Sequence, residues 1–294
     1  YGSSSTFIRD TAFPSVASGF TWTGDAADLF IKDSEKTGAT ALLTAASSSE
    51  TTTKTYSVVA AAGACDVSLT YSGSLPTASH AAFSADGDYK ACVKMVDSAG
   101  NISYIAASSN VTRDIVAPSA TMSLINAASD GLINASEHTS NTSVMGAAPS
   151  GSADMASSTY KLIPSGTSCA GALVFGASIP AANSSDFTTD GTYSICMRLV
   201  DTAGNIAFAS SGSITLDVAA PTLTAAALAN EAANGFINDS EKTGTGALIS
   251  AATASESSTI TYALAGSSAT CSAVSGYASG IPATNDSGLS SDGT

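Results

Sequence analysis

Apolar and polar residues alternate most clearly in two stretches of the chain that closely resemble each other. Residues 86–101 read DGDYKACVKMVDSAGN, and residues 190–205 read DGTYSICMRLVDTAGN. In the second stretch one face would carry the apolar side chains Tyr193, Ile195, Met197 and Leu199. A period of two predicts a half-buried strand, and the Asp-Gly and Gly-Asn pairs near its ends predict tight turns.

The two stretches are 104 residues apart (190 − 86), and other features recur at almost the same period. The recurring positions are three prolines (Pro14, Pro118, Pro221), three tyrosines (Tyr56, Tyr160, Tyr262) and three cysteines (Cys65, Cys169, Cys271). Such recurrence predicts tandem structural repeats. We expect repeats at residues 14–117, 118–220 and 221–294, with residues 1–13 forming the last strand of a preceding repeat. The third repeat would be truncated before its last two strands.

Each repeat contains about seven short strand candidates, which are separated by turns rich in Gly, Pro, Asp and Ser. No segment shows a convincing helical period, and alanine runs such as residues 60–62 are too short to nucleate a helix. We therefore predict an all-β protein made of tandem Ig-like antiparallel β-sandwich repeats of about 104 residues.

The charge of the chain narrows the choice of partners. The formal net charge is −14, from 10 basic and 24 acidic residues. Nucleic acid is excluded as an expected partner because no basic stripe is available to neutralise phosphates. We also expect no membrane span in this segment, since no apolar run reaches about 18–20 residues. An acidic chain of this kind suits divalent cations with oxygen ligands.

The cysteines recur as pairs with one spacing. Cys65 and Cys92 are 27 residues apart, as are Cys169 and Cys196, and the partner of Cys271 would lie in the missing strand. One pair per repeat, without close C-x-x-C pairs, predicts disulfides rather than zinc sites, and hence an extracellular location. Because Cys196 alternates with the apolar residues of its strand, we expect its disulfide on the outer surface and not in the sandwich core.

Several carboxylates are expected at the junctions between repeats. In an Ig-like unit the loops that follow strands A and E lie at the end where the chain leaves, and the turn between strands F and G lies where it enters. A junction would therefore gather oxygen atoms from two repeats, which suits Ca²⁺. The predicted metal ligands are Asp28, Glu35, Asp97, Asp114, Asp130, Asn134, Glu137, Asp201 and Asp217.

The alternative is that these acids only cap turns, because Asp-Gly and Gly-Asn form turns by themselves. We favour turn capping for Asp86 and Asp190, which stand in the Asp-Gly turns, and calcium binding for the acids at the junctions. The two histidines, His80 and His138, belong to no recognisable Ser-His-Asp or Cys-His set. We therefore expect no enzymatic activity.

Four motifs together carry a resemblance to a known family. They are D-G-L-I-N-A-S-E at 130–137, D-G-T-Y at 190–193, V-D-T-A-G-N at 200–205 and L-D-V-A-A-P-T at 216–222. With them the chain resembles, over essentially its whole length, the bacterial Ig-like (BIg) tandem repeats of giant extracellular surface adhesins. The resemblance implies a β-sandwich, a rod-like tandem arrangement, a stalk role in cell-surface attachment, and junction calcium on Asp97, Asp114, Asp201 and Asp217. The chain departs from the family in its disulfide per repeat, its Ala and Ser content, and Asn234 at the position of Asp130.

These observations lead to one expected function and two alternatives. We expect a structural segment of a long protein on the bacterial cell surface, stiffened by calcium and disulfides, whose partners are neighbouring repeats of the same chain. The first alternative is an extracellular fibre or sheath formed by lateral self-association, for example through strand addition. The second is a carbohydrate-binding module, which is disfavoured because matching aromatic platforms are not evident.

Overall fold

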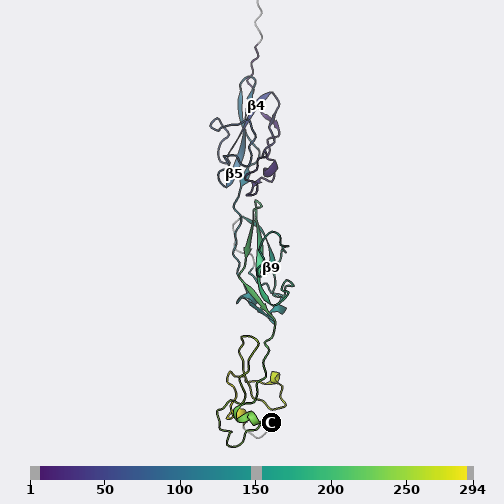
Figure 1. Cartoon of the computed structure of the whole chain (residues 1–294). Helices are drawn as coiled ribbons and strands as arrows, with labels where there is room; N and C mark the ends of the chain where they lie inside the picture. The colour runs from purple at the N-terminus through teal and green to yellow at the C-terminus, as the bar shows by residue number, and fades with distance from the viewer. Residues whose placement is uncertain (1–6, 147–153, 290–294) are drawn as a thin grey trace, which may run out of the picture. The chain divides into compact units, whose positions relative to one another are not determined.

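The computed structural model describes residues 7–146 and 154–289, and the chain divides into two compact units, Tyr1–Val218 and Ala219–Thr294. The first unit contains two five-stranded sheets, each with its own hydrophobic core. The ribbon of both is drawn in Figure 1. The predicted all-β sandwich fold is confirmed, since strands and short 3-10 turns are the regular elements of the described residues. None of the described helices is long and apolar enough to cross a membrane. The repeat boundaries stay a prediction, and residues 7–13 belong to no strand.

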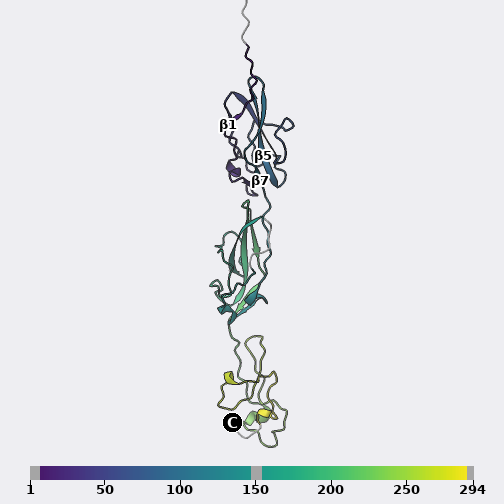
Figure 2. The ribbon, with the colours of Figure 1, turned by 180° about the vertical axis from the view of Figure 1, so that it is seen from behind.

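The first sheet has the order β2-β7-β5-β4, and β6 also pairs with β5. Its strands are β2 (Phe30–Ile31), β4 (Thr52–Ala60), β5 (Gly87–Asp97), β6 (Ile102–Ala106) and β7 (Val111–Arg113). The short β2 runs parallel to β7, and every other pair is antiparallel; β7 and β5 lie side by side in Figure 2. A sparser second layer contains β1 (Val16–Ser18), β3 (Ser47–Ser48) and the bridge between Trp22 and Leu43.

The second sheet repeats the first with a shift in numbering. Its strands are β8 (Leu132–Asn134), β9 (Met155–Pro164), β10 (Gly191–Asp201), β11 (Ile206–Ser210) and β12 (Ile214–Asp217). Strand β10 begins 104 residues after β5 (191 − 87), and β8 pairs in parallel with β12 as β2 does with β7. The period seen in the sequence is therefore a period of the structure.

Strand β10 shows the predicted alternation. Its buried core residues are Tyr193, Ile195, Met197 and Leu199, whereas Arg198 and Val200 on the other face are half-exposed. Each large apolar side chain that leaves water contributes about 1.5–3 kcal/mol to folding. Alternating burial therefore fixes the register of β10 against β9, because a slip by one residue would turn the apolar set outward.

Both predicted disulfides are present. Cys65 is bonded to Cys92 and Cys169 to Cys196, with Cα–Cα distances of 5.5 and 5.3 Å. Cys271 is exposed and makes no disulfide. Each bridge closes a loop with a sequence separation of 27, and the chain-entropy estimate for such a loop is about 3–4 kcal/mol.

The expected surface position of the second disulfide needs correction. Cys196 lies outside the hydrophobic core cluster, as the alternation predicts, but its side chain is 0% exposed. The loop that carries Cys169 folds back over the outer face of the sheet, where the Phe175 ring lies 5.9 Å from the Phe208 ring. The disulfide thus belongs to a small second apolar layer rather than to the exposed surface.

The second unit, Ala219–Thr294, contains isolated bridges and 3-10 turns in its described residues. The bridge between Leu228 and Ile249 corresponds to the bridge between Trp22 and Leu43 of the first unit. The 3-10 turns of residues 7–146 and 154–289 are η1 (Gly24–Ala26), η2 (Asn126–Ala128), η3 (Glu137–Thr139), η4 (Asn230–Asn234), η5 (Cys271–Ala273) and η6 (Ser287–Leu289). Residues at corresponding positions of the sequence therefore form bridges in both units.

Candidate metal centre

Two groups of three carboxylates gather in the first unit, and both are within the described residues. The first triad is Asp10, Glu50 and Asp97, and the second triad is Asp114, Asp154 and Asp201. In each triad one oxygen from every side chain lies within 4.8 Å of the others. Every member of the second triad is 104 residues after its counterpart in the first (114 − 10, 154 − 50, 201 − 97). The structure therefore builds the same acidic site twice.

In the second triad, Asp201 is held by the turn that it begins. It ends β10, and its Oδ1 accepts the backbone N–H of Asn205 at 2.8 Å while its Oδ2 accepts the Asn205 side-chain N–H at 2.9 Å. Gly204 has φ +93, a left-handed conformation that a residue with a Cβ adopts at a cost. The Asp-x-Ala-Gly-Asn motif thus fixes the direction of a carboxylate that is only 2% exposed.

Asp97 in the first triad is held by the same geometry. Asn101 donates to it from the backbone and from the side chain, both at 2.8 Å. The Asn101 side chain is the main cause that holds the pKa of Asp97 below its ordinary value, although burial opposes the shift. This carboxylate therefore stays ionised over a wider pH range than an ordinary aspartate.

Asp114 directly follows β7, and its backbone N–H donates to Ile31 O at 3.0 Å. Burial raises the pKa of the Asp114 carboxyl above its ordinary value. The nearby charges of Asp201 and Asp154 add to this rise in the pKa of Asp114, while the Val116 N–H opposes it. Negative charge is thus crowded at the second triad.

Asp154 supplies the observation that bears most directly on a cation. Its backbone carbonyl accepts the N–H of Thr202 at 2.9 Å and the Thr202 hydroxyl at 2.8 Å, which places it beside the Asp201 turn. Its Oδ1 is buried and accepts no hydrogen bond from the residues that the structure describes. A buried carboxylate oxygen without a donor is costly unless a cation neutralises it. The donor set, all oxygen and all acidic, fits a hard divalent cation such as Ca²⁺.

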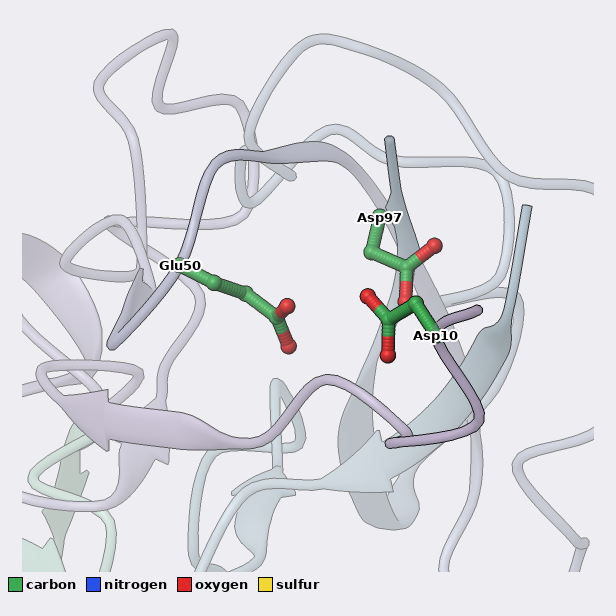
Figure 3. A group of neighbouring side chains, drawn as sticks. All are labelled: Asp10, Glu50 and Asp97. Atoms are coloured by element: carbon green, nitrogen blue, oxygen red, sulfur yellow. The ribbon is translucent and has the colours of Figure 1, made fainter. Parts of the chain in front are cut away.

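Figure 3 shows that the three carboxylates of the first triad point toward one shared space. Asp10 Oδ1 also accepts the N–H of Ala12 at 3.0 Å, and the Glu50 carbonyl accepts the Ser48 hydroxyl at 2.6 Å. Glu50 takes the place that Asp154 has in the second triad, and its side chain is longer by one methylene group. The chemistry of the first triad is otherwise that of the second.

The other predicted ligands near β2 and β8 are engaged in local turns. Asp28 Oδ1 accepts the N–H of Phe30 at 3.0 Å, and Asp130 Oδ1 accepts the N–H of Leu132 at 2.9 Å. Glu35 pairs with the Lys32 ammonium at 2.8 Å. Among the described residues these side chains belong to neither triad.

The same description applies to the loop after β8. Asn134 Oδ1 accepts the N–H groups of Ser136 and Glu137, and Glu137 Oε2 accepts the Asn134 N–H at 3.0 Å. Asp217 ends β12. Of the nine predicted ligands, the structure brings Asp114 and Asp201 together in one triad and places Asp97 in the other. Calcium binding by all nine stays a prediction.

Three triad members were missed from the sequence: Asp10, Glu50 and Asp154. Asp10 could have been found as the counterpart of Asp114, because each lies four residues before a recurring proline, Pro14 or Pro118. Glu50 and Asp154 carry no motif, and only their 104-residue offset could have drawn attention to them. The counterpart in the third repeat is Glu256, which follows Asp154 by 102 residues, as Tyr262 follows Tyr160.

The two histidines have packing roles. The His80 ring lies 6.4 Å from the Phe83 ring, and its Nδ1 accepts the N–H of Ala82 at 3.2 Å. The His138 ring lies 5.9 Å from the Phe187 ring in an edge arrangement. Each ring therefore packs beside a phenylalanine of one hydrophobic core.

Comparison with known proteins gives only distant similarity. No protein-family model and no curated protein sequence matches the chain. One similar structure is a Ca²⁺-stabilised adhesin that helps an Antarctic bacterium reach out and bind ice, with 23% identity, coverage of 79% of this chain and 56% of that one, and a TM-score of 0.36. A second comes from a 1.5-MDa bacterial ice-binding adhesin, with 18% identity, coverage of 75% and 70%, and a TM-score of 0.36.

A third similar structure is a tetra-tandem repeat from the extending region of a large adhesion protein, with 17% identity, coverage of 62% and 46%, and a TM-score of 0.27. The chain thus spans about half the length of the first structure. These neighbours are segments of large adhesins. Similarity at these TM-scores carries no argument about the metal or the function of this chain.

Proposed function

We propose that the chain is a structural, non-catalytic segment of a long bacterial cell-surface adhesin, in which Ig-like repeats form a rod-like stalk stiffened by Ca²⁺. The observation that carries this proposal is the second triad. It joins Asp114, which directly follows β7 of the first sheet, to two residues of the second sheet's region. Asp154 directly precedes β9, and Asp201 ends β10. A cation shared by these carboxylates would limit bending of the segment after β7.

Without a cation, the same charges would favour bending of the segment after β7, because the carboxylates would move apart. Three carboxylates with oxygens within 4.8 Å repel one another, and burial raises the pKa of Asp114 as expected for an uncompensated charge. Calcium, which takes six to eight oxygen ligands, would use the carboxylates together with water and backbone carbonyls. Stiffness of the stalk would then depend on the calcium concentration outside the cell.

The disulfides support an extracellular location. Two bonds with the same spacing, each joining a half-buried loop cysteine to a buried strand cysteine, are expected in an oxidising compartment and are rare in the cytosol. Each ties the loop after one strand, β4 or β9, to the neighbouring strand, β5 or β10, and neither joins one sheet to the other. Disulfides would therefore protect the single repeat, and calcium would act between repeats.

The test is a calcium titration of the whole chain followed by small-angle scattering with and without chelator. We expect at least two bound ions, one for each triad, and a shorter, more flexible particle in chelator. Asp154→Asn should remove one ion from the stoichiometry. The control is Asp66→Asn, because Asp66 is half-buried like Asp154 but belongs to neither triad, and its Oδ1 accepts the Ser68 N–H at 2.9 Å.

Two results would count against the proposal. Absence of calcium uptake in the millimolar range would remove the metal, and scattering unaffected by chelator would mean that cations do not stiffen the chain. Sedimentation at several protein concentrations completes the test. Reversible or filamentous self-association of the chain would favour the extracellular fibre over the stalk.

A further inference from the structure

The Asn205 amide connects the turn after β10 to segments that follow strands of the first sheet. Asn205 is 5% exposed and stands next to the second triad. Its Nδ2 donates to Asp201 Oδ2 in its own turn and to the backbone carbonyl of Asp114, both at 2.9 Å. Its Oδ1 accepts the backbone N–H of Asp33 at 2.8 Å. Both N–H bonds of the amide group and one oxygen lone pair are thus used.

Two of these partners lie in segments that follow strands of the first sheet. Asp33 follows β2 and is 172 residues away from Asn205 in the sequence, and Asp114 follows β7. Both are contacted through backbone atoms. The Asp33 side chain instead pairs with Lys36 at 2.6 Å. The contact therefore involves no charged group on the first sheet and does not depend on ionisation.

The same turn also lies near a side chain of the first sheet's end. A Cβ on Gly204 would lie 3.4 Å from Lys32 Cδ, at the near edge of an ordinary van der Waals contact. The turn that ends at Asn205 thus lies beside the segment after β2.

We propose that Asn205 is a cation-independent interaction site, which holds the turn at residues 201–205 against the segments that follow β2 and β7. This goes beyond the proposed calcium function. The triad needs a cation to overcome its own repulsion, whereas the Asn205 contact consists of hydrogen bonds among neutral groups and one to a carboxylate. It would keep Asp114 and Asp201 within reach of each other before any ion arrives.

Asn101 provides an internal comparison. It makes the same bonds in its own turn, to both oxygens of Asp97, and its Nδ2 lies 3.5 Å from the carbonyl of Asp10. No N–H or O–H among the described residues donates to Asn101 Oδ1. Removal of either amide therefore costs the same bonds within a turn, but only removal of Asn205 costs a bond to Asp33.

The test measures amide hydrogen exchange at Asp33 in the whole chain, with chelator present throughout. In the wild type we expect a protected Asp33 N–H, and in Asn205→Ala exchange at least about fivefold faster, the value of one net hydrogen bond. Asn101→Ala should leave exchange at Asp33 unchanged. Protection along β10 reports in the same samples that the second sheet remains folded.

A second variant removes the bond from the other side, in case Asn205→Ala unfolds its turn. Asp33 is the second residue of a turn in which Glu35 N–H donates to Lys32 O at 2.9 Å, a position that accepts proline. Asp33→Pro deletes the donor N–H and leaves the Asn205 turn intact. We expect ¹⁵N relaxation to show the two sheets tumbling together in the wild type and separately in Asp33→Pro.

The inference is overturned if the Asp33 N–H is unprotected from exchange in the wild type, or if it is equally protected in Asn205→Ala and the wild type. Joint tumbling of the two sheets in Asp33→Pro would overturn it as well. Since all of these measurements are made in chelator, they do not depend on calcium. A chain that takes up no calcium would refute the proposed function while leaving this inference standing, and the reverse outcome is equally distinguishable.

Discussion

Replacement of Asp114 by asparagine should change stability in opposite directions with and without calcium. The substitution preserves the shape of the side chain and the oxygen that accepts the Val116 N–H at 3.1 Å. It also leaves the backbone bonds of Asp114 to Ile31 and Asn205 in place. What it removes is one of three negative charges.

The size of the effect follows from the geometry of the triad. Two unit charges 4.8 Å apart repel by about 1 kcal/mol in water and by about 3.5 kcal/mol at an effective dielectric constant of about 20. Because Asp114 is half-buried, we expect Asp114→Asn to stabilise the chain by about 1–3 kcal/mol in chelator. For a unit of about 200 residues each kcal/mol corresponds to a rise in Tm of about 2–4 °C.

Calcium should reverse this order. A cation at a hundred times its Kd stabilises the folded state by about 2.7 kcal/mol, and a variant that has lost a ligand forfeits most of that gain. Thermal unfolding followed by circular dichroism, in chelator and in calcium, measures both values. Asp66→Asn serves again as the matched control, with no calcium-dependent change.

The reasoning is refuted if Asp114→Asn destabilises the chain in chelator, because the carboxylate would then be serving the fold rather than repelling its neighbours. A variant that is more stable in both conditions would refute the cation instead. Only a crossing of the two stabilities supports a site that is strained when empty and satisfied when filled.

Two further predictions concern the first sheet and its loops. Burial lowers the pKa of His80, so the folded state disfavours its protonated form; the resulting stability is complete above the unfolded pKa of about 6.5 and is lost as the pH falls through that value. His80→Ser should flatten this pH dependence in urea titrations between about pH 7 and 5, because serine does not titrate in this range. Serine suits the position, since Ser184 at the same repeat position also accepts an N–H, from Asp186 at 3.3 Å. An unchanged pH dependence would show that His80 is not its cause. Leu29 has φ +68 where the other repeats have Gly131 and Gly235 at φ +83 and +84, so Leu29→Gly should stabilise the chain by about 0.5–1 kcal/mol. Leu29→Ala, which retains the Cβ, should show no such gain in Tm, and equal effects of the two substitutions would exclude backbone strain as the cause.

Local patterns explain which parts of the structure could be predicted. The alternation in β10 and the turn residues at its ends depend on neighbours in the sequence, so the strand, its apolar face and the Asp201 turn were all accessible. The disulfides were accessible through their constant spacing. The burial of Cys196 was not, because it depends on how the loop with Cys169 folds back over the sheet.

Sequence patterns did not predict which carboxylates form the metal site. Asp154 reaches Asp201 because β9 and β10 pair with Met155 opposite Asp201, a register set by long-range packing. In the first sheet the pairing of Thr52 with Asp97 brings Glu50 close in the same way. Asp28 and Asp130, which stand in stronger motifs, accept N–H groups two residues away. A motif thus identified the turn, and the pairing register decided which carboxylates meet.

The parallel pairing of β2 with β7 has a mechanical consequence. The chain enters the first sheet ahead of β2 and leaves it after β7, so tension on the chain pulls these two strands in opposite directions along their common axis. The bonds from Thr112 N–H to Leu29 O and from Asp114 N–H to Ile31 O, at 2.9 and 3.0 Å, are then loaded together in shear rather than opened one after another. If β2 and β7 separated, the disulfide between Cys65 and Cys92 would still hold its two cysteines together. The chain between these cysteines, with a sequence separation of 27, could otherwise extend to about 90 Å. A pulled chain would resist first and then lengthen only in part.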